Sequence, residues 1–103
     1  GVRVSLVAEI DRAPAGFAMA KVEFGEFGRP EPVAVIDTIG VDPNFRRAGV
    51  ASALLSQLVV NLRGLAIDRV ETEVARDQFD LLGFFYRRGF GPSQRLAFAH
   101  ALA

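Results

Sequence analysis

Apolar residues in the first part of the chain recur at every second position, which is the period of a β-strand with one buried face. We predict strands over residues 2–10, 17–24 and 33–41. The first two form a hairpin, because residues 11–16 between them contain a Pro and a Gly. The third is apolar on both faces except at Asp37 and Thr38, as expected of a strand inside a sheet. Two Pro and two Gly predict a loop over residues 25–32.

In the second half of the chain, the apolar residues recur at helical spacing in two segments. We predict helices over residues 47–63 and 78–88, and strands over residues 67–75 and 94–100. Gly64 and Gly89 follow the two helices, where glycine commonly ends a helix. The order is β-β-β-α-β-α-β, an α/β (α+β) fold with a mixed central sheet. The strand–helix–strand passage predicts a parallel pair joined by a right-handed crossover.

The composition narrows the class of protein. A chain of 103 residues, half of them hydrophobic, is expected to form one domain, residues 1–103. Lys+Arg and Asp+Glu both number 12, and this balance argues against a nucleic-acid-binding protein. Without Cys there are no disulfides, thiolate zinc sites or Cys nucleophiles, and no His, Asp and Glu cluster suggests a metal site. No apolar run approaches the roughly 18 residues of a membrane span, so we expect a cytoplasmic protein.

A turn rich in arginine and small residues joins the third strand to the first helix. The first N–H groups of a helix lack internal partners, and the helix dipole adds positive potential, so such a turn is suited to bind an anion. Arg46 and Arg47 add charge, while Gly49 and Ala51 would let a phosphate approach the backbone. The alternative is that both arginines are solvated loop residues and Gly49 serves only the turn.

The pattern Arg46-x-x-Gly49-x-Ala51 resembles the acyl-CoA signature of the GCN5-related N-acetyltransferase (GNAT) family, which is Gln or Arg, two residues, Gly, one residue, then Gly or Ala. The preceding strand and following helix resemble the family's order, and the resemblance runs from about residue 4 to residue 98. It implies that acetyl-CoA is the co-substrate, with its pyrophosphate at the turn and its pantetheine along the end of the third strand. The implied CoA-binding residues here are Ile39, Gly40, Val41, Arg46, Arg47, Ala48, Gly49, Val50, Ala51 and Ser52. Gly40 suits a close approach of the ligand, or alternatively a β-bulge.

The second predicted helix resembles another signature of the family, Asn-x-x-Ala-x-x-x-Tyr-x-x-x-Gly-Phe. Alignment on the closing Gly-Phe pair places Gln78 at the Asn and Phe85 at the Tyr, which is often the general acid for the departing CoA thiolate. Tyr86, one residue later, is the candidate catalytic acid; the alternative is a packing role. Gln78, Phe85 and Arg88 are implied CoA contacts, although Arg88 alternatively only favours the helix C-terminus.

A general base must take a proton from the ammonium group of the acceptor. Asp37 is the first candidate because it lies on the strand that enters the site, and Glu73 is the second. The alternative for Asp37 is a structural hydrogen bond within the sheet.

The resemblance implies direct transfer of an acetyl group to the amine of a small molecule or peptide. One alternative is a catalytically inactive module that binds acyl-CoA for sensing, and another is a structural dimerisation domain. The family's N-terminal strand and helix pair has no counterpart in residues 1–103. We therefore expect either a homodimer that covers the exposed sheet edge, or a chain that is the C-terminal part of a longer protein.

Overall fold

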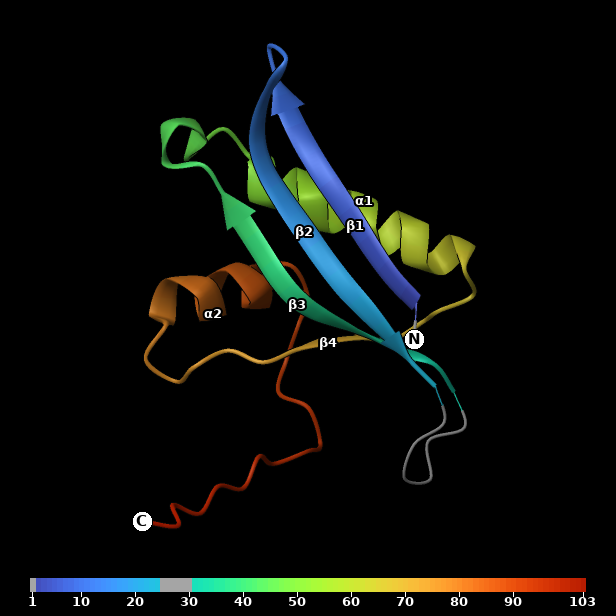
Figure 1. Cartoon of the computed structure of the whole chain (residues 1–103), viewed down its shortest axis with the longest axis vertical. Helices are drawn as coiled ribbons and strands as arrows, with labels where there is room; N and C mark the ends of the chain where they lie inside the picture. The colour runs from blue at the N-terminus through green and yellow to red at the C-terminus, as the bar shows by residue number, and fades with distance from the viewer. Residues whose placement is uncertain (1, 25–30) are drawn as a thin grey trace. The chain divides into compact units, whose positions relative to one another are not determined.

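The computed structural model describes residues 2–24 and 31–103 and divides into two units, Gly1–Thr72 and Glu73–Ala103 (Figure 1). The first unit contains β1 (Val2–Ile10), β2 (Ala13–Glu23), β3 (Val33–Val41), the 3-10 turn η1 (Pro43–Phe45), α1 (Val50–Gly64) and β4 (Val70–Thr72). The second unit contains α2 (Phe79–Arg87). This is the predicted mixed α+β fold, and β1 and β3 have the predicted bounds. The predicted loop over residues 25–32 lies mostly outside the described residues.

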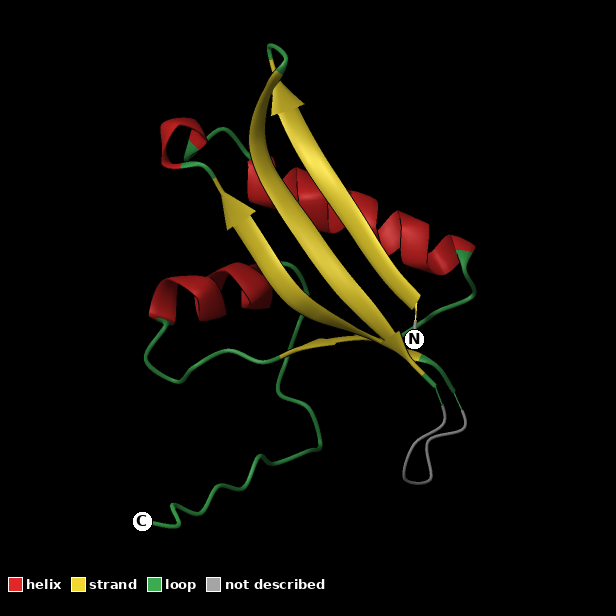
Figure 2. Cartoon of the chain, in the orientation of Figure 1, coloured by secondary structure: helices red, strands yellow, loops and turns green. Residues whose placement is uncertain are grey.

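The strands form one sheet in the order β1-β2-β3-β4. β1, β2 and β3 are antiparallel neighbours, whereas β4 runs parallel to β3, as the strand–helix–strand passage predicts. Figure 2 shows that β4 is much shorter than the other three strands. It covers only Val70–Thr72, so the predicted strand over residues 67–75 was too long.

The hairpin between β1 and β2 is tighter than predicted. Asp11 and Arg12 have positive φ angles of 50° and 69°, as in the two-residue turns that favour hairpins. β2 therefore begins at Ala13, and the prediction of a turn over residues 11–16 was wrong. Pro14 is accommodated because the register shifts there: Ala8 faces Gly16 while Glu9 faces Pro14, which leaves one extra residue in β2 as a bulge.

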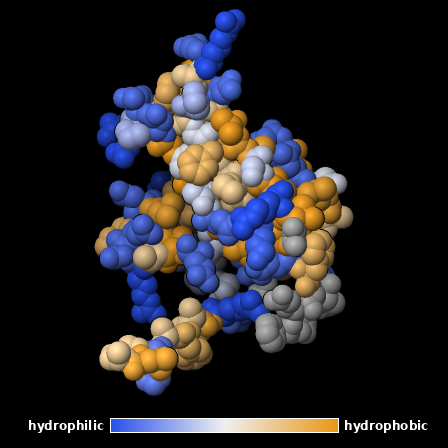
Figure 3. All heavy atoms as spheres, viewed as in Figure 1, coloured by the Kyte–Doolittle hydropathy of each residue, from blue (hydrophilic) through white to orange (hydrophobic). Residues whose placement is uncertain are grey.

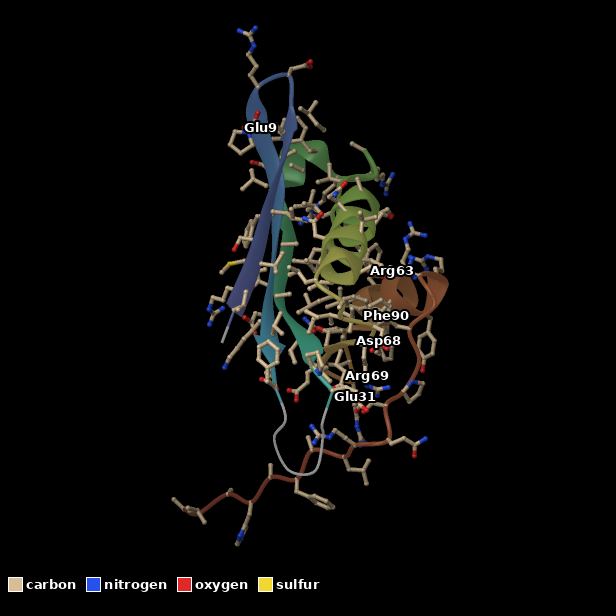
Figure 4. The ribbon with its side chains drawn as sticks, turned by 90° about the vertical axis from the view of Figure 1, so that its right-hand side faces the viewer. Glu9, Glu31, Arg63, Asp68, Arg69 and Phe90 are labelled. Carbon is tan, nitrogen blue, oxygen red and sulfur yellow. The ribbon has the colours of Figure 1, made fainter. Side chains whose placement is uncertain are left out.

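Helix α1 packs on β1, β2 and β3, and Figure 4 shows it on one face of these strands. Its buried residues recur at helical spacing: Val50, Leu54, Leu55, Leu58 and Leu62. The middle strand offers small side chains to the helix, since Ala15 and Ala18 are fully buried in the cluster that contains Val50 and Leu54. The N-terminal end of α1 is thereby held against the sheet beside the end of β3.

Both helices end in the same hydrogen-bond pattern. After α2, Gly89 has a φ of 91°, its N–H donates to the Tyr86 oxygen at 3.1 Å, and the Phe90 N–H donates to the Phe85 oxygen at 3.0 Å. This is the Schellman arrangement, in which glycine takes the left-handed position. After α1, the same position is taken by Ala66, with a φ of 62°. Gly64 is the last residue of that helix, so its assignment as the cap was two residues too early.

Two other predictions about the helical half were wrong. The first helix begins at Val50 rather than at residue 47, because Gly49 has a left-handed conformation and forms the N-cap. No strand forms over residues 94–100, where Leu96 and Phe98 are 77% and 92% exposed. Alternating side chains do not make a strand unless the backbone has a neighbour to pair with. None of the helices within residues 2–24 and 31–103 is long and apolar enough to cross a membrane.

Candidate coenzyme A site

The turn between β3 and α1 is held in place by a backbone hydrogen bond to β2 and by two of its own side chains. The Asp42 N–H donates to the Ala15 oxygen of β2 at 2.8 Å, and the Asp42 carboxylate accepts from the Asn44 N–H at 2.8 Å. Three residues later in the chain, Phe45 packs against the cluster of Val50 and Leu54. The hydrogen bonds of Asp42 and the packing of Phe45 together determine the path of the chain from β3 to the start of α1.

After Phe45, the backbone contains two residues in the left-handed conformation. Arg47 and Gly49 have φ angles of 66° and 76°, and residues 46–49 are exposed. The hydrogen bonds of α1 begin with the Ala53 N–H, which donates to the Gly49 oxygen at 3.0 Å. Within the described part of the chain, no backbone oxygen accepts from the N–H groups of Gly49, Val50 or Ala51. These donors lie at the positive end of the helix dipole, next to two arginines, so the turn is suited to hold a phosphate group.

Gly49 leaves the approach to this turn open. A Cβ atom at this position would have no other atom within 4 Å, so lack of space does not explain why a glycine is found here. Its positive φ explains the choice, since other residues rarely adopt that conformation. The predicted pyrophosphate residues, 46–52, therefore form one continuous segment across the helix N-terminus.

The end of β3 is open along one side. β4 pairs with β3 only at residues 34–36, so among the described residues Thr38–Val41 pair with β2 alone. The Ile39 and Val41 side chains point toward the α1 cluster, while Gly40 lies under the Phe17 ring, where a Cβ would be 3.1 Å from a ring carbon. Within the first unit, the outer backbone edge of residues 38–41 therefore makes no strand pairing, and an extended chain such as pantetheine pairs with an edge of this kind.

A bulge does occur in β3, but at Asp37 and not at Gly40. Met19 faces Thr38 and Ala20 faces Ile36, which leaves Asp37 as the extra residue. Its carboxylate forms an ion pair with Arg3 of β1 at 2.8 Å, in which the two side chains are 57% and 36% exposed. The alternative role predicted for Asp37, a structural hydrogen bond within the sheet, is therefore observed as its ion pair with Arg3. Its role as a general base stays a prediction.

The model of the acetyltransferase (GNAT) family matches residues 3–90. The chain belongs to this family. Its members are acyl-CoA-dependent N-acetyltransferases. The binding of acyl-CoA at the turn before α1 stays a prediction. No curated protein sequence matches the chain.

Solved structures share the GNAT fold over nearly the whole chain. The complex of AAC(6')-Iy with the bisubstrate analog CoA-S-monomethyl-acetylneamine has a TM-score of 0.81 and 21% identity, over 98% of this chain and 70% of that one. The aminoglycoside 6'-N-acetyltransferase AAC(6')-IG of Acinetobacter haemolyticus has a TM-score of 0.80 and 21% identity, over 98% and 71%. The ribosomal-protein-alanine N-acetyltransferase of Brucella melitensis biovar Abortus 2308 has a TM-score of 0.78 and 17% identity, over 97% and 71%. At these identities the likeness concerns the fold.

The residues of the second GNAT signature lie in the second unit. Phe85 is 5% exposed, and its ring packs against Phe84 and Phe90 at centroid distances of 5.3 and 5.0 Å. Tyr86, by contrast, is 58% exposed. The phenylalanine in the tyrosine position thus has a packing role within this unit. Tyr86 as the general acid stays a prediction.

The other two candidates of the second unit are at the ends of α2. Gln78 is the N-cap residue, and its side chain makes no capping hydrogen bond. The Arg88 guanidinium lies 5.4 Å from the centroid of the Phe84 ring, a cation–π distance. Neither observation tests the predicted contact with CoA. No group of three His, Asp or Glu side chains gathers as a metal site within the described ranges.

Three residues that shape the site were not identified from the sequence. Asp42 caps the turn, Gly16 leaves room for the start of α1, and Arg3 holds Asp37. The Asp-Pro pair after an apolar strand could have suggested the cap. Nothing local in the sequence connects Arg3 with Asp37, which are 34 positions apart.

Proposed function

We propose that this GNAT domain binds acetyl-CoA and transfers its acetyl group to a primary amine. The observation that carries the proposal is the turn at residues 46–52. Among the described residues no backbone oxygen accepts from the N–H groups of Gly49, Val50 and Ala51, and Arg46 and Arg47 lie beside them. In the proposed complex, the CoA pyrophosphate accepts hydrogen bonds from these N–H groups. The pantetheine extends along residues 39–41 of β3, which among the described residues pair with β2 only.

In the proposed reaction, the amine nitrogen attacks the thioester carbonyl carbon directly. The carbonyl oxygen gains negative charge in the transition state, and a backbone N–H near the end of β3 stabilises it. The C–S bond then breaks, the CoA thiolate takes up a proton, and the acetylated nitrogen gives one up. Asp37 is the proposed base and Tyr86 the proposed acid, and solvent can protonate the thiolate if Tyr86 does not. Much of the rate enhancement comes from holding the two reactants together.

The proposed acceptor is a small-molecule or peptide amine. Structural relatives include aminoglycoside acetyltransferases and a ribosomal-protein-alanine acetyltransferase, so the fold by itself accommodates both classes. A second candidate function is an inactive module that binds acyl-CoA. The buried Phe85 in the tyrosine position favours it, because a phenyl ring cannot donate a proton.

The proposal is tested first by calorimetric titration of acetyl-CoA into the wild type, Gly49→Glu and Gly64→Glu. Each substitution adds a carboxylate at one end of α1, and a Cβ at either position would have no atom within 4 Å. Gly49→Glu also places a side chain on a residue with a positive φ, which Gly64→Glu does not. Circular dichroism checks that each variant is folded. We expect wild-type binding to be lost in Gly49→Glu, where the new charge repels the pyrophosphate, and to persist in Gly64→Glu. Equal affinity of Gly49→Glu and the wild type would show that the turn is not the site.

Catalysis is tested separately by acetyl transfer to a panel of amines and peptides. We expect Asp37→Asn and Tyr86→Phe to lower turnover while acetyl-CoA still binds. If neither variant slows turnover, both catalytic assignments are wrong. Binding without transfer to any amine, in a protein that also fails to hydrolyse acetyl-CoA, would favour the inactive module.

A further inference from the structure

The pairing of β3 with β4 ends at a hydrogen bond from a side chain. Ala34 faces Val70 across the parallel pair, and its N–H donates at 3.0 Å to the oxygen of Arg69, the residue before Val70. In this slanted pattern, a carbonyl on β3 accepts from the residue after its partner. Ile36 faces Thr72, the last residue of β4, and its oxygen accepts from the Thr72 hydroxyl at 3.2 Å. The hydroxyl thus takes the place of the next backbone donor of a longer ladder.

The Thr72 side chain lies on the side of the sheet that α1 covers. Ile36 is 4% exposed and faces Ala20 of β2, and residues directly opposite each other on neighbouring strands share a face. Ala18, two residues before Ala20, is buried in the cluster that contains Val50 of α1. Thr72 is half-buried on this side. An oxygen that loses its donor here is costly, because water replaces a lost partner poorly in a buried place.

The other face of β4 carries an ion pair that does not connect it to β3. Glu71 faces Val35, and its carboxylate lies 2.7 Å from Nε of Arg69. Both partners belong to one short segment and the Arg69 side chain is 54% exposed, so the pair contributes little to holding the two strands together. Figure 3 shows the side of the molecule on which the sheet lies in front of α1, where hydrophilic side chains are interspersed among apolar ones. The Thr72 hydroxyl, by contrast, joins the two strands directly.

The outer edge of β3 changes its spacing directly after this hydrogen bond. The Ile36 oxygen points to β4, whereas the Asp42 N–H donates to β2. Because backbone groups alternate between the two edges of a strand, those of Ile39 and Val41 point to the outer edge. The bulge at Asp37 makes the step from Ile36 to Ile39 three residues instead of two. A strand that keeps the regular period from Ile36 onward would therefore miss the groups of Ile39 and Val41.

We propose that the Thr72 hydroxyl ends the pairing of β3 with β4 and thereby sets where the CoA-binding edge of β3 begins. This role rests on the proposed function, because residues 39–41 are taken there as the pantetheine-binding edge. Thr72 is a positioning residue: it holds the end of β4 on Ile36 and touches neither CoA nor the acceptor. An extended ligand then pairs with Ile39 and Val41 in a register of its own. Without the hydroxyl, the end of β4 is no longer fixed beside that ligand.

The end of the ladder is tested without CoA, by amide hydrogen exchange measured by NMR on the wild type, Thr72→Val and Thr72→Ser. Valine keeps the branched shape and lacks the hydroxyl, whereas serine keeps the hydroxyl and lacks the methyl group. We expect the amides of β4 and Ile36 to exchange about fivefold faster in Thr72→Val and at the wild-type rate in Thr72→Ser. The amides of β2 report global opening and serve as the internal reference. Exchange in Thr72→Val equal to that of the wild type, relative to β2, would overturn the proposal.

The consequence for the site is tested by titration of acetyl-CoA into the same three proteins. We expect about fivefold weaker binding by Thr72→Val and wild-type affinity in Thr72→Ser, because only valine lacks the donor. Wild-type affinity in Thr72→Val, despite faster exchange in β4, would show that the end of β4 does not set the CoA-binding edge. A wild type that binds no acetyl-CoA would instead overturn the proposed function, and the exchange rates would still decide whether the hydroxyl ends the ladder.

Discussion

Replacing Gly16 by alanine should destabilise the domain, because β2 passes closely under the first turn of α1 at this residue. A Cβ atom there would lie 2.7 Å from the Gly40 oxygen, 2.9 Å from Val50 Cγ1 and 3.2 Å from Leu54 Cδ1. The Gly40 oxygen belongs to the backbone of β3 and cannot turn away as a side chain does. The added methyl group must therefore push β3 or the start of α1 out of place, and overpacking of this kind costs about 1–3 kcal/mol.

Gly64→Ala is the matched control, since the same methyl group is added to the same helix. A Cβ there has no neighbour within 4 Å, and the residue is already helical, so alanine mainly restricts the unfolded chain. This stabilises the protein by about 0.4–1 kcal/mol. Urea unfolding followed by circular dichroism should thus give changes of opposite sign. The reasoning is refuted if Gly16→Ala is as stable as the wild type. Val50 begins α1 and lies within the proposed CoA-binding turn, so Gly16→Ala should also weaken acetyl-CoA binding, whereas Gly64→Ala should not.

Two further substitutions test the turns at the ends of α1. Ala66→Gly removes the cost of a left-handed alanine, roughly 1–2 kcal/mol, but the unfolded chain gains entropy, which offsets part of this. We expect a net increase in stability of about 0.5–1 kcal/mol. A loss of stability in the same urea assay would contradict the left-handed conformation of Ala66. Asp42→Ala removes the acceptor for the Asn44 N–H, and the loss of such a cap costs about 0.5–2 kcal/mol. Asp42→Asn retains a side-chain oxygen and should behave like the wild type in stability and in acetyl-CoA titrations. If Asp42→Ala and Asp42→Asn both bind acetyl-CoA like the wild type, the hydrogen bond from the Asn44 N–H to Asp42 does not shape the site.

The sequence predicted well those elements whose residues carry a local signal. The alternation in β1 and the apolar run in β3 gave their bounds, and the helical spacing of the leucines gave α1. The errors arose where the outcome depends on a partner strand. Pro14 and Gly16 are common in turns, but here a bulge lets both belong to β2. The alternating residues near the C-terminus have a strand pattern, but they pair with none of the strands that the structure describes.

The prediction that Gly64 caps α1 was wrong for a different reason. A helix ends where its last carbonyls find donors, and here the Ile67 N–H donates to the Leu62 oxygen at 3.0 Å. That hydrogen bond fixes the left-handed position at Ala66, although Gly64 has the intrinsic preference for it. The packing of the buried Leu62 and Ile67 thus decides the end of the helix against local propensity.

For the candidate site, the signature covers residues 39–41 and 46–52, which lie in one continuous stretch of the sequence, and their role in binding acetyl-CoA stays a prediction. A single passage from β3 into α1 brings together the backbone edge, the left-handed turn and the helix N-terminus. The residues that support it could not be predicted, since Gly16 and Arg3 approach the segment from other strands.

The proposed binding residues and the proposed acid belong to different units of the chain. The proposed acetyl-CoA residues of the first unit form one segment whose shape depends on Gly49, Asp42 and Gly16. The proposed acid, Tyr86, belongs to the second unit, as does Phe85 in the position of the family's tyrosine. An active acetyltransferase and an inactive acyl-CoA-binding module would consequently share the same CoA-binding turn, and only transfer to an amine distinguishes them.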